Sequence, residues 1–352
     1  MRRPTLSVIV PALHCASTLA RCLRALRGSA PAPGSWEVIV VDDGSTDDTA
    51  VVAERMADRV VRIADGPRGP AAARNRGAAV ATGEVLVFVD ADVCVAPDAL
   101  WRFEERFAGD PALTAAFGAY DLAPEAPTFV SQYRNLLHHY VHATGAGLAV
   151  TFWAGCGAVR AADFRAAGGF DERRFRRPQI EDVELGYRLA AAGARIRLDP
   201  DIQGKHLKRW TWRGGVVTDV RDRGVPWMLL LLERGEVASA GPLNLQRREK
   251  VLTAVAAAAL PLGVGGAALG SVALLGAGAG ALAVVLVGNA PVLRWFARTR
   301  GTGFAICVAP LRIQYYWLNA WSAAWAAAVH LRRDRRAGRR PGRAPPAISS
   351  HR

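Results

Sequence analysis

The sequence predicts an α/β domain, built on a mostly parallel sheet with helices on both faces and followed by C-terminal membrane helices. Short β-branched runs at 5–11, 37–43 and 84–92 alternate with segments of helical spacing. These runs are apolar at consecutive positions, as expected for strands that are covered on both faces. The membrane helices are predicted by a stretch of 43 residues, 251–293, that contains no charged side chain.

The formal net charge of +14 is concentrated near one end of the chain. From Pro291 onward twelve arginines are balanced by one acid, Asp334, so residues 1–290 are close to neutral. A basic end that follows apolar segments fits an anionic membrane surface. No aromatic-basic recognition pattern is present, so we expect no nucleic-acid partner. The five cysteines have no paired spacing, which predicts free thiols in a reducing compartment.

Two acidic clusters follow two of the predicted strands. Asp42 and Asp43 come after EVIVV, and Asp90 and Asp92 come after EVLVFV. Ligands of parallel sheets bind at the carboxyl ends of the strands, where both clusters fall. Side chains at i and i+2 of an extended segment point the same way, so Asp90 and Asp92 could share one divalent cation. This pattern predicts a site for a nucleoside diphosphate, although DDGS alone is equally compatible with turn chemistry.

Three further candidate residues lie beyond residue 150. Asp182 is in the first turn of a predicted helix, where free amides and the helix dipole keep a carboxylate ionised. It is either a proton acceptor or a plain helix N-terminal acid. His206 is either a ligand of a cation or diphosphate, or a structural histidine. Trp153 either stacks on an acceptor or belongs to the core.

The order of five sequence signatures resembles glycosyltransferase family 2, whose members adopt the GT-A fold. The signatures are VIVPALHCASTLARCL, VIVVDDGSTDDT, AARNRGAAVATGEVLVFVDAD, GGFDE and EDVELGYRLAAAG, and they cover roughly residues 5–207. The resemblance implies an enzyme of the hexosyltransferase type. Such an enzyme uses a nucleotide-diphosphate sugar, is assisted by Mg²⁺ or Mn²⁺, and inverts the sugar carbon through direct attack by an acceptor hydroxyl.

The resemblance also implies roles on the donor side of the site. The residues expected to bind the nucleotide are Pro11, Asp42, Asp43, Arg74, Asn75 and Asp90. The residues expected to bind the cation are Asp90, Asp92 and His206. Asp90 and Asp92 match the family's DXD pair, in which Asp92 would bridge the cation to the diphosphate and Asp90 would lie nearer the ribose.

On the acceptor side, the resemblance makes Asp182 the catalytic base. The other residues expected there are Trp153, Glu181, Arg209 and Trp210. The segment from His206 to Trp210 resembles the QxxRW element of processive members, except that His206 replaces the glutamine, which argues against processivity. An amphipathic anchor at the membrane surface is an equally good interpretation of Arg209 and Trp210.

The chain is expected to have four parts. They are a catalytic domain (1–208), amphipathic interfacial helices (209–248), a membrane region (249–331) and a basic disordered tail (332–352). Residues 251–293 are long enough for a hairpin of two helices with a turn near Gly276–Gly280, and its many Gly and Ala residues would allow close packing.

The last apolar segment, 304–331, contains Pro310 and Arg312. A third span would carry the basic tail outside, so we expect a re-entrant or interfacial helix, with a third span left as the alternative. The predicted protein is therefore a multi-pass protein of the cell membrane with its catalytic domain on the cytoplasmic face.

Several functions are compatible with these features. A transferase could act on a lipid-linked or glycan acceptor, or on a polyprenyl phosphate. A non-catalytic nucleotide-binding membrane scaffold would be expected to lack Asp90, Asp92 or Asp182, and all three are present. A dinucleotide-dependent oxidoreductase would need GxGxxG after the first strand, and VIVPALHCAS has no glycine.

Overall fold

A computed structural model describes residues 5–29, 36–237 and 246–336 of the chain. The chain divides into two compact units, Met1–Trp212 and Arg213–Arg352. The first unit contains the β-sheet, and the described part of the second unit is helical.

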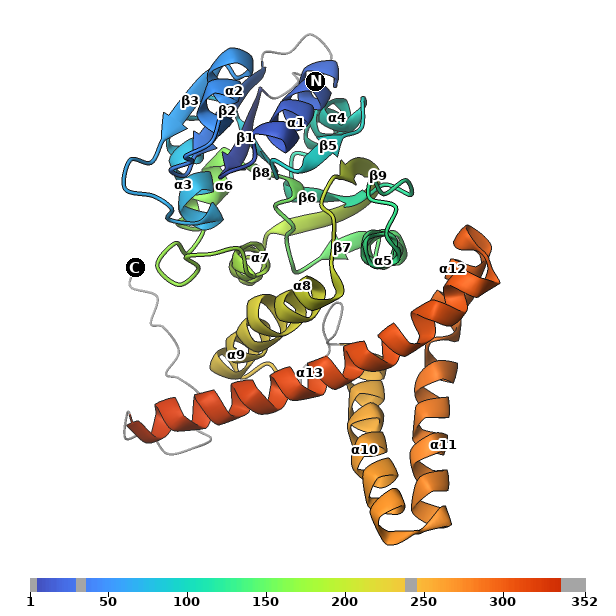
Figure 1. The fold of residues 1–352 in the computed structure, drawn as a ribbon. Helices are drawn as coiled ribbons and strands as arrows, with labels where there is room; N and C mark the ends of the chain where they lie inside the picture. Colours follow the sequence, from blue (N-terminus) through green and yellow to red (C-terminus); the bar gives the residue numbers. More distant parts are fainter. Residues whose placement is uncertain (1–4, 30–35, 238–245, 337–352) are drawn as a thin grey trace. The chain divides into compact units, whose positions relative to one another are not determined.

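The first unit is built on a nine-stranded sheet, within the residues that the structure describes (Figure 1). Its order is β3-β2-β1-β4-β8-β6-β9-β5, with β7 paired to β9. The first four strands in this order are parallel, whereas β8 lies antiparallel between β4 and β6. The predicted α/β class is thus confirmed, with a sheet that is parallel in one half and mixed in the other. The strands are β1 (Leu6–Ala12), β2 (Trp36–Asp42), β3 (Arg59–Arg62), β4 (Val85–Val89), β5 (Val93–Val95), β6 (Leu113–Tyr120), β7 (Gly147–Ala149), β8 (Cys156–Arg160) and β9 (Arg195–His206).

Helices cover both faces of this sheet. Val8 and Val10 of β1 belong to an apolar cluster with Leu19 of α1. Ile9 points to the opposite face, because successive strand side chains alternate. There, a Cβ added to Gly77 of α3 would come within 2.5 Å of the Ile9 side chain, so the helix lies directly on the strand. The helices of this unit are α1 (Ala16–Gly28), α2 (Thr49–Met56), α3 (Pro70–Val80), α4 (Ala99–Gly109), α5 (Phe129–Thr144), α6 (Ala161–Ala166) and α7 (Glu181–Ala191).

The second unit begins with a short helical region and ends with one long helix. Leu230 and Leu231 of α9 are buried, and α9 packs on α13. Part of the apolar face that was predicted to lie on a membrane therefore packs within the unit. The helices are α8 (Trp212–Val217), which begins at the boundary, the π-helix η1 (Thr218–Gly224), α9 (Val225–Arg234), α10 (Arg247–Leu269), α11 (Val272–Gly288), α12 (Ala290–Arg300) and α13 (Thr302–Arg336).

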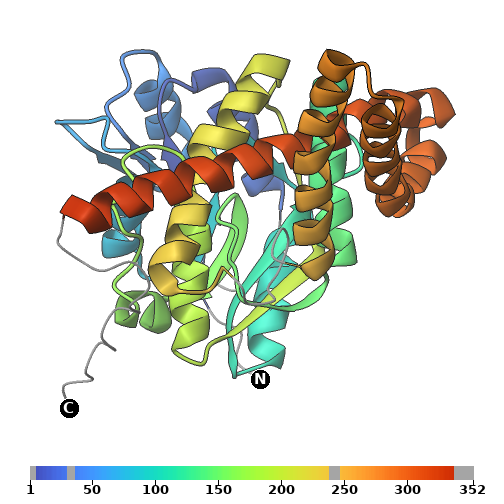
Figure 2. The ribbon, with the colours of Figure 1, turned by 90° about the horizontal axis from the view of Figure 1, so that it is seen from below.

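Helices α10 and α11 form the predicted hairpin, and they lie side by side in both ribbon views (Figures 1 and 2). The predicted turn near Gly276–Gly280 is wrong. The chain turns at Gly270, which adopts a left-handed conformation (φ +63°), and Ser271 caps α11 through the backbone N–H of Leu274. The later glycines lie inside α11, where a Cβ on Gly278 would be 3.1 Å from the Gly263 backbone. The small residues thus permit close helix packing, as predicted.

Among the described helices, α10 alone is long and apolar enough to cross a membrane. Helix α11 with α12 would provide a second span only if the pair, bent by 59°, counts as one. Helix α13 continues through Pro310 without a break and is helical as far as Arg336, the last described residue. The predicted disordered tail therefore does not begin at residue 332, and its remainder, 337–352, lies outside the described residues.

The arginine inside the last apolar segment belongs to a buried polar cluster. Arg312 Nε donates to Asn289 Oδ1 at 2.7 Å, and one of its Nη atoms lies 3.8 Å from Glu249 Oε2. The Tyr316 hydroxyl donates to the same Glu249 oxygen at 3.0 Å. A buried charge is tolerated when it is paired and hydrogen-bonded. Arg312 therefore connects α13 to the base of the hairpin.

Candidate active site

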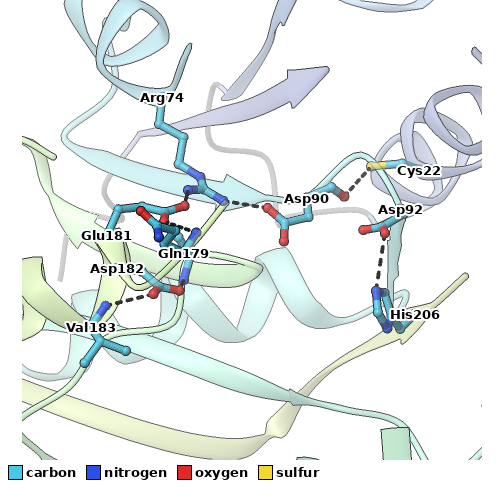
Figure 3. A network of polar contacts seen from close by, with 10 residues as sticks. Cys22, Arg74, Asp90, Asp92, Gln179, Glu181, Asp182, Val183 and His206 are labelled. Carbon is cyan, nitrogen blue, oxygen red and sulfur yellow. Dashed lines mark hydrogen bonds and ion pairs between the residues drawn. The ribbon is translucent and has the colours of Figure 1, made fainter. Parts of the chain in front are cut away.

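The Asp90–Asp92 segment is a turn and not an extended strand end. Strand β4 ends at Val89, and the backbone N–H of Val93 donates to Asp90 O at 2.9 Å, which closes the turn. The expectation that both aspartates point the same way is therefore wrong, because the i, i+2 rule applies only to extended backbone. Asp90 points toward Arg74, and Asp92 points toward His206 (Figure 3).

Arg74 connects two signatures that are distant in the sequence. One Nη donates to Asp90 Oδ1 at 2.7 Å, and the other donates to Glu181 Oε1 at 2.8 Å (Figure 3). The guanidinium is buried, with 4% of the residue exposed. Burial lowers its pKa, but the two carboxylates raise the pKa by more, so the arginine stays charged. Arg74 thus holds the donor-side Asp90 and the start of α7 in one network.

Glu181 and Asp182 have different tasks at the start of α7. Both oxygens of Glu181 are engaged, one by Arg74 and the other by the backbone N–H of Gln179 at 2.9 Å. Because both of its oxygens are engaged, Glu181 stabilises the start of α7. This geometry does not support its expected role in binding the acceptor substrate. Asp182 accepts from the backbone N–H groups of Ala154 at 3.1 Å and Val183 at 2.8 Å.

Asp182 is the carboxylate whose proton affinity suits acid–base chemistry. Burial, followed by the like charge of Glu181, raises the pKa of Asp182 to about 6. Arg74 acts in the opposite direction. A base with a pKa close to the operating pH is ionised at neutral pH and still accepts a proton readily. Asp182 is therefore suited to take a proton from a hydroxyl.

Asp92 and His206 form a pair on the other side of the turn. His206 Nε2 lies 3.3 Å from Asp92 Oδ2. Burial raises the pKa of Asp92, but its contact with His206 and the positive charge of Lys208 lower the pKa by more, so the net shift is downward. The backbone N–H of Leu207 donates to Asp92 O at 2.8 Å, which fixes the turn against the end of β9.

Asp92 and His206 could hold a divalent cation if a substrate supplied the remaining ligands. Among the described residues, no group of three or more His, Cys, Asp or Glu side chains is arranged to hold a metal ion. The three expected ligands are thus not brought together, because Arg74 draws Asp90 away from Asp92 and His206. One carboxylate and one imidazole remain. Mg²⁺ and similar ions are commonly held by one or two carboxylates, with substrate phosphates completing the shell.

The other donor-side residues support the loops around this turn. Asp43 accepts from the backbone N–H groups of Arg68 at 2.8 Å and Gly69 at 2.7 Å, so it holds the loop before α3. Asp42 is 4% exposed and accepts from the backbone N–H of Ser45. Pro11, on the neighbouring strand β1, is partly exposed and pairs in register one residue before Asp42. Their contact with a nucleotide remains a prediction.

Asn75 is used by the GGFDE turn. Its Nδ2 donates to Phe170 O at 2.8 Å, and its Oδ1 accepts from the Phe170 N–H at 2.9 Å. Both ends of the amide are thus occupied by backbone. The expected contact of Asn75 with a nucleotide gains no support from this geometry, and its evident task is to tie α3 to the turn before α7.

We expect Gly69→Ala to destabilise the first unit by more than about 2 kcal/mol. Gly69 has φ +94°, and an added Cβ would lie 2.5 Å from the backbone oxygen of Arg176. Thermal unfolding of the purified variant measures the loss. The matched control is Gly168→Ala, which also has a positive φ (+78°) but no atom within 4 Å of the added Cβ. Equal losses in the two variants would contradict the proposed steric effect.

Aromatic and imidazole rings lie between Asp182 and His206. Trp153 precedes Ala154, whose N–H contacts Asp182. Its ring packs edge-on against Tyr120, with centroids 4.9 Å apart. Tyr120 in turn stacks on His206 at 4.5 Å and 6°. These ring contacts link Trp153, the neighbour of Ala154, to His206 of the Asp92–His206 pair. Trp153 is partly exposed there, as an acceptor-facing residue would need to be.

Trp210 is not an exposed membrane anchor. It is 8% exposed, and its ring lies under the cations of Arg134 and Lys208, each 4.2 Å from a ring centroid. Its backbone N–H donates to Ser131 Oγ at 2.8 Å. Arg209 is exposed, and its acceptor role remains a prediction. The buried ring therefore excludes the anchor interpretation for Trp210.

The sequence did not indicate two residues that contact His206. Asn135 on α5 accepts from His206 Nδ1 at 2.8 Å, and Tyr120 at the end of β6 stacks on the ring. Both come from the irregular middle of the sequence, which carries no recognised signature. A buried asparagine within an otherwise amphipathic helix is the only signal that could have drawn attention to Asn135.

The fold and the site together define a transferase domain of the GT-A type. Residues 7–165 match the family described as Glycosyl transferase family 2. The N-terminal domain is therefore a glycosyltransferase family 2 domain over these residues.

Two curated relatives are glycosyltransferases. Validoxylamine A glucosyltransferase from Streptomyces hygroscopicus subsp. limoneus is 32% identical over 221 residues, which cover 54% of this chain and 49% of that protein. Pre-mycofactocin glycosyltransferase from Mycobacterium tuberculosis is 30% identical over 299 residues, which cover 80% of this chain and 55% of that protein. The chain thus spans about half the length of the curated relatives that it matches.

A solved structure has a similar fold. It is a mannosyltransferase from Pyrobaculum calidifontis in complex with GDP-Man and Mn²⁺, with a TM-score of 0.56 and 21% sequence identity. The match covers 92% of this chain and 88% of that chain. At this level of identity the likeness concerns the fold.

Proposed function

We propose that this chain is a membrane-associated, inverting glycosyltransferase that moves a sugar from a nucleotide-diphosphate sugar to a lipid-linked or glycan acceptor with the help of a divalent cation. The observation that carries this proposal is that the expected cation ligands and the expected base lie on opposite sides of the Asp90–Asp92 turn. The Asp92–His206 pair lies on one side, and Asp182 lies on the other, joined to the turn through Arg74 and Glu181.

In the proposed reaction, the acceptor oxygen attacks the anomeric carbon as the bond to the diphosphate oxygen breaks. The bonding electron pair leaves with the nucleoside diphosphate, and the hydroxyl proton goes to Asp182. When bound, a divalent cation would stabilise the negative charge that develops on the diphosphate. Asp92 and His206 would hold it, while Arg74 keeps Asp90 in the network with Glu181. A single displacement needs no protein nucleophile and inverts the anomeric carbon.

Two further observations support the cation and the donor. One carboxylate and one imidazole at 3.3 Å leave room in a cation's shell for phosphate oxygens. The structural relative from Pyrobaculum calidifontis is described in complex with GDP-Man and Mn²⁺. We infer the same classes of ligand here, namely a nucleotide-diphosphate sugar together with Mg²⁺ or Mn²⁺.

The membrane part of the proposal rests on the α10–α11 hairpin. Apolar side chains at its turn are largely exposed, with Leu269 at 75% and Val272 at 82%. Exposed apolar surface of this kind marks an interaction with a membrane or a partner. The basic side chains of α12, Arg294, Arg298 and Arg300, would contact anionic headgroups. We propose that the hairpin inserts from the cytoplasmic side of the cell membrane, and that the acceptor is carried by lipid.

A panel of nucleotide sugars tests this function. Detergent-purified protein is incubated with each donor, Mn²⁺ or Mg²⁺, and membrane lipid extract, and the released nucleoside diphosphate is measured. We expect release from one donor, abolished by chelator and reduced at least about 100-fold by Asp92→Ala. Supplying polyprenyl phosphate in place of the extract distinguishes that acceptor. Nucleotide binding without turnover on any acceptor would instead support a non-catalytic scaffold.

A further inference from the structure

The His206 ring is fixed by two residues of the first unit. Its Nδ1 lies 2.8 Å from Asn135 Oδ1, and its plane is parallel to that of Tyr120 within 6°. Asn135 is 2% exposed and His206 is 5% exposed, so the contact is shielded from water. The other nitrogen, Nε2, faces Asp92. The ring therefore has one nitrogen fixed inward and the other directed at the proposed cation site.

Asn135 determines which ring nitrogen carries a proton. An amide oxygen only accepts hydrogen bonds, so Nδ1 must be the donor in this contact. A neutral imidazole protonated at Nδ1 has its lone pair on Nε2, which can then bind a metal. The opposite orientation of the amide would present its N–H groups to Nδ1 and move the ring proton to Nε2, where it would block a cation.

We propose that Asn135 is a positioning residue that makes Nε2 of His206 a ligand for the divalent cation. This inference rests on the cation-dependent transfer proposed above. Hydrogen bonds from outer residues to ligating histidines commonly change metal affinity by about 10–100-fold. Asn135 is buried behind the imidazole ring and acts through His206, while the stacked Tyr120 ring limits tilting of the imidazole.

Mn²⁺ binding to the full chain in detergent tests this inference without turnover. Free Mn²⁺ is followed by electron paramagnetic resonance, alone and with uridine or guanosine diphosphate. We expect Asn135→Leu to weaken Mn²⁺ binding on the order of 10-fold or more. Asn135→Asp keeps an acceptor for Nδ1 and should bind Mn²⁺ within a few-fold of the wild type. This second variant also separates loss of the hydrogen bond from loss of the fold.

Spin-echo modulation from a directly bound imidazole nitrogen provides a second readout. It should be present in the wild type and in Asn135→Asp, weakened in Asn135→Leu and absent in His206→Gln. The matched control is Leu136→Val, a buried neighbour on α5, for which Mn²⁺ affinity should be unchanged. Unchanged affinity and unchanged nitrogen signal in Asn135→Leu would overturn the role of Asn135 while leaving the cation site in place. Absence of Mn²⁺ binding by the wild type would overturn both proposals.

Discussion

Replacing Asp182 with asparagine should lower kcat by about 10²–10⁴-fold while making the protein more stable at neutral pH. Asp182 accepts from the Ala154 N–H through one oxygen and from the Val183 N–H through the other, so the single oxygen of the amide keeps one of these two contacts. It cannot take a proton from the acceptor. The measurement is a pair of assays on purified protein, one of kcat for the donor found in the panel and one of thermal unfolding.

The stability gain follows from the direction of the pKa shift. The pKa of Asp182 is raised from its ordinary 3.8 to about 6, so the folded state disfavours the ionised form. The penalty is absent below about pH 4, grows as the pH rises through the folded pKa and is complete above it. Each pKa unit corresponds to about 1.4 kcal/mol, so removal of the charge can contribute up to about 3 kcal/mol at pH 7.5 and nothing at pH 4, less about 1 kcal/mol at either pH for the lost N–H contact.

The same titration predicts the pH dependence of the wild type. The kcat/KM should fall about tenfold per pH unit below about pH 6, because protonated Asp182 cannot accept the hydroxyl proton. The control is Asp163→Asn, which removes another first-turn acid, in α6, and should leave both rate and stability nearly unchanged. Retention of kcat within a few-fold by Asp182→Asn would exclude Asp182 as the base.

The second large effect is expected for Arg74→Met, which should cost about 3–5 kcal/mol of stability and abolish detectable transfer. The substitution leaves the Glu181 carboxylate buried without its cation and frees Asp90 from its 2.7 Å contact. Arg74→Lys should recover little, because one ammonium group cannot reproduce a fork that reaches two carboxylates from two nitrogens.

A double variant separates stability from function at this position. Arg74→Met combined with Glu181→Gln removes the uncompensated charge, so it should regain part of the lost stability and still lack activity. The matched control is Arg76→Met on the same helix, whose side chain is 53% exposed and whose contact with Glu172 is 3.9 Å long. Such exposed pairs contribute about 0–1 kcal/mol. An unfolding midpoint for Arg74→Met equal to that of Arg76→Met would contradict the proposed role of the network.

Sequence pattern alone determined which segments form strands and helices, and it placed the aspartate clusters at the carboxyl ends of the strands. Strand periodicity is a local property, so β1, β2 and β4 were expected within a few residues of their observed bounds. The clusters Asp42–Asp43 and Asp90–Asp92 were placed correctly at the carboxyl ends of β2 and β4 for the same reason. The free state of all five cysteines, predicted from their spacing, is also confirmed.

The direction of side chains depended on contacts between distant segments. Asp90 and Asp92 point apart because a turn closes between Asp90 and Val93, and because Arg74 and His206 attract them to opposite sides. The turn of the α10–α11 hairpin was misplaced for a related reason. The eight glycines of the uncharged run 251–293 cannot be told apart by composition. Only packing decides that Gly278 lies at a helix contact while Gly270 takes the left-handed conformation.

Family signatures and side-chain chemistry thus indicated the candidate site residues. Tertiary structure alone decided which other residues hold them in place. Arg74 reaches Glu181 across 107 positions of the chain, and Asn135 reaches His206 across 71. Contacts over such separations form only when the sheet and its helices have assembled, so no local pattern records them. The charged residues of the site can therefore be predicted from the sequence, whereas the residues that orient their side chains are defined by the fold.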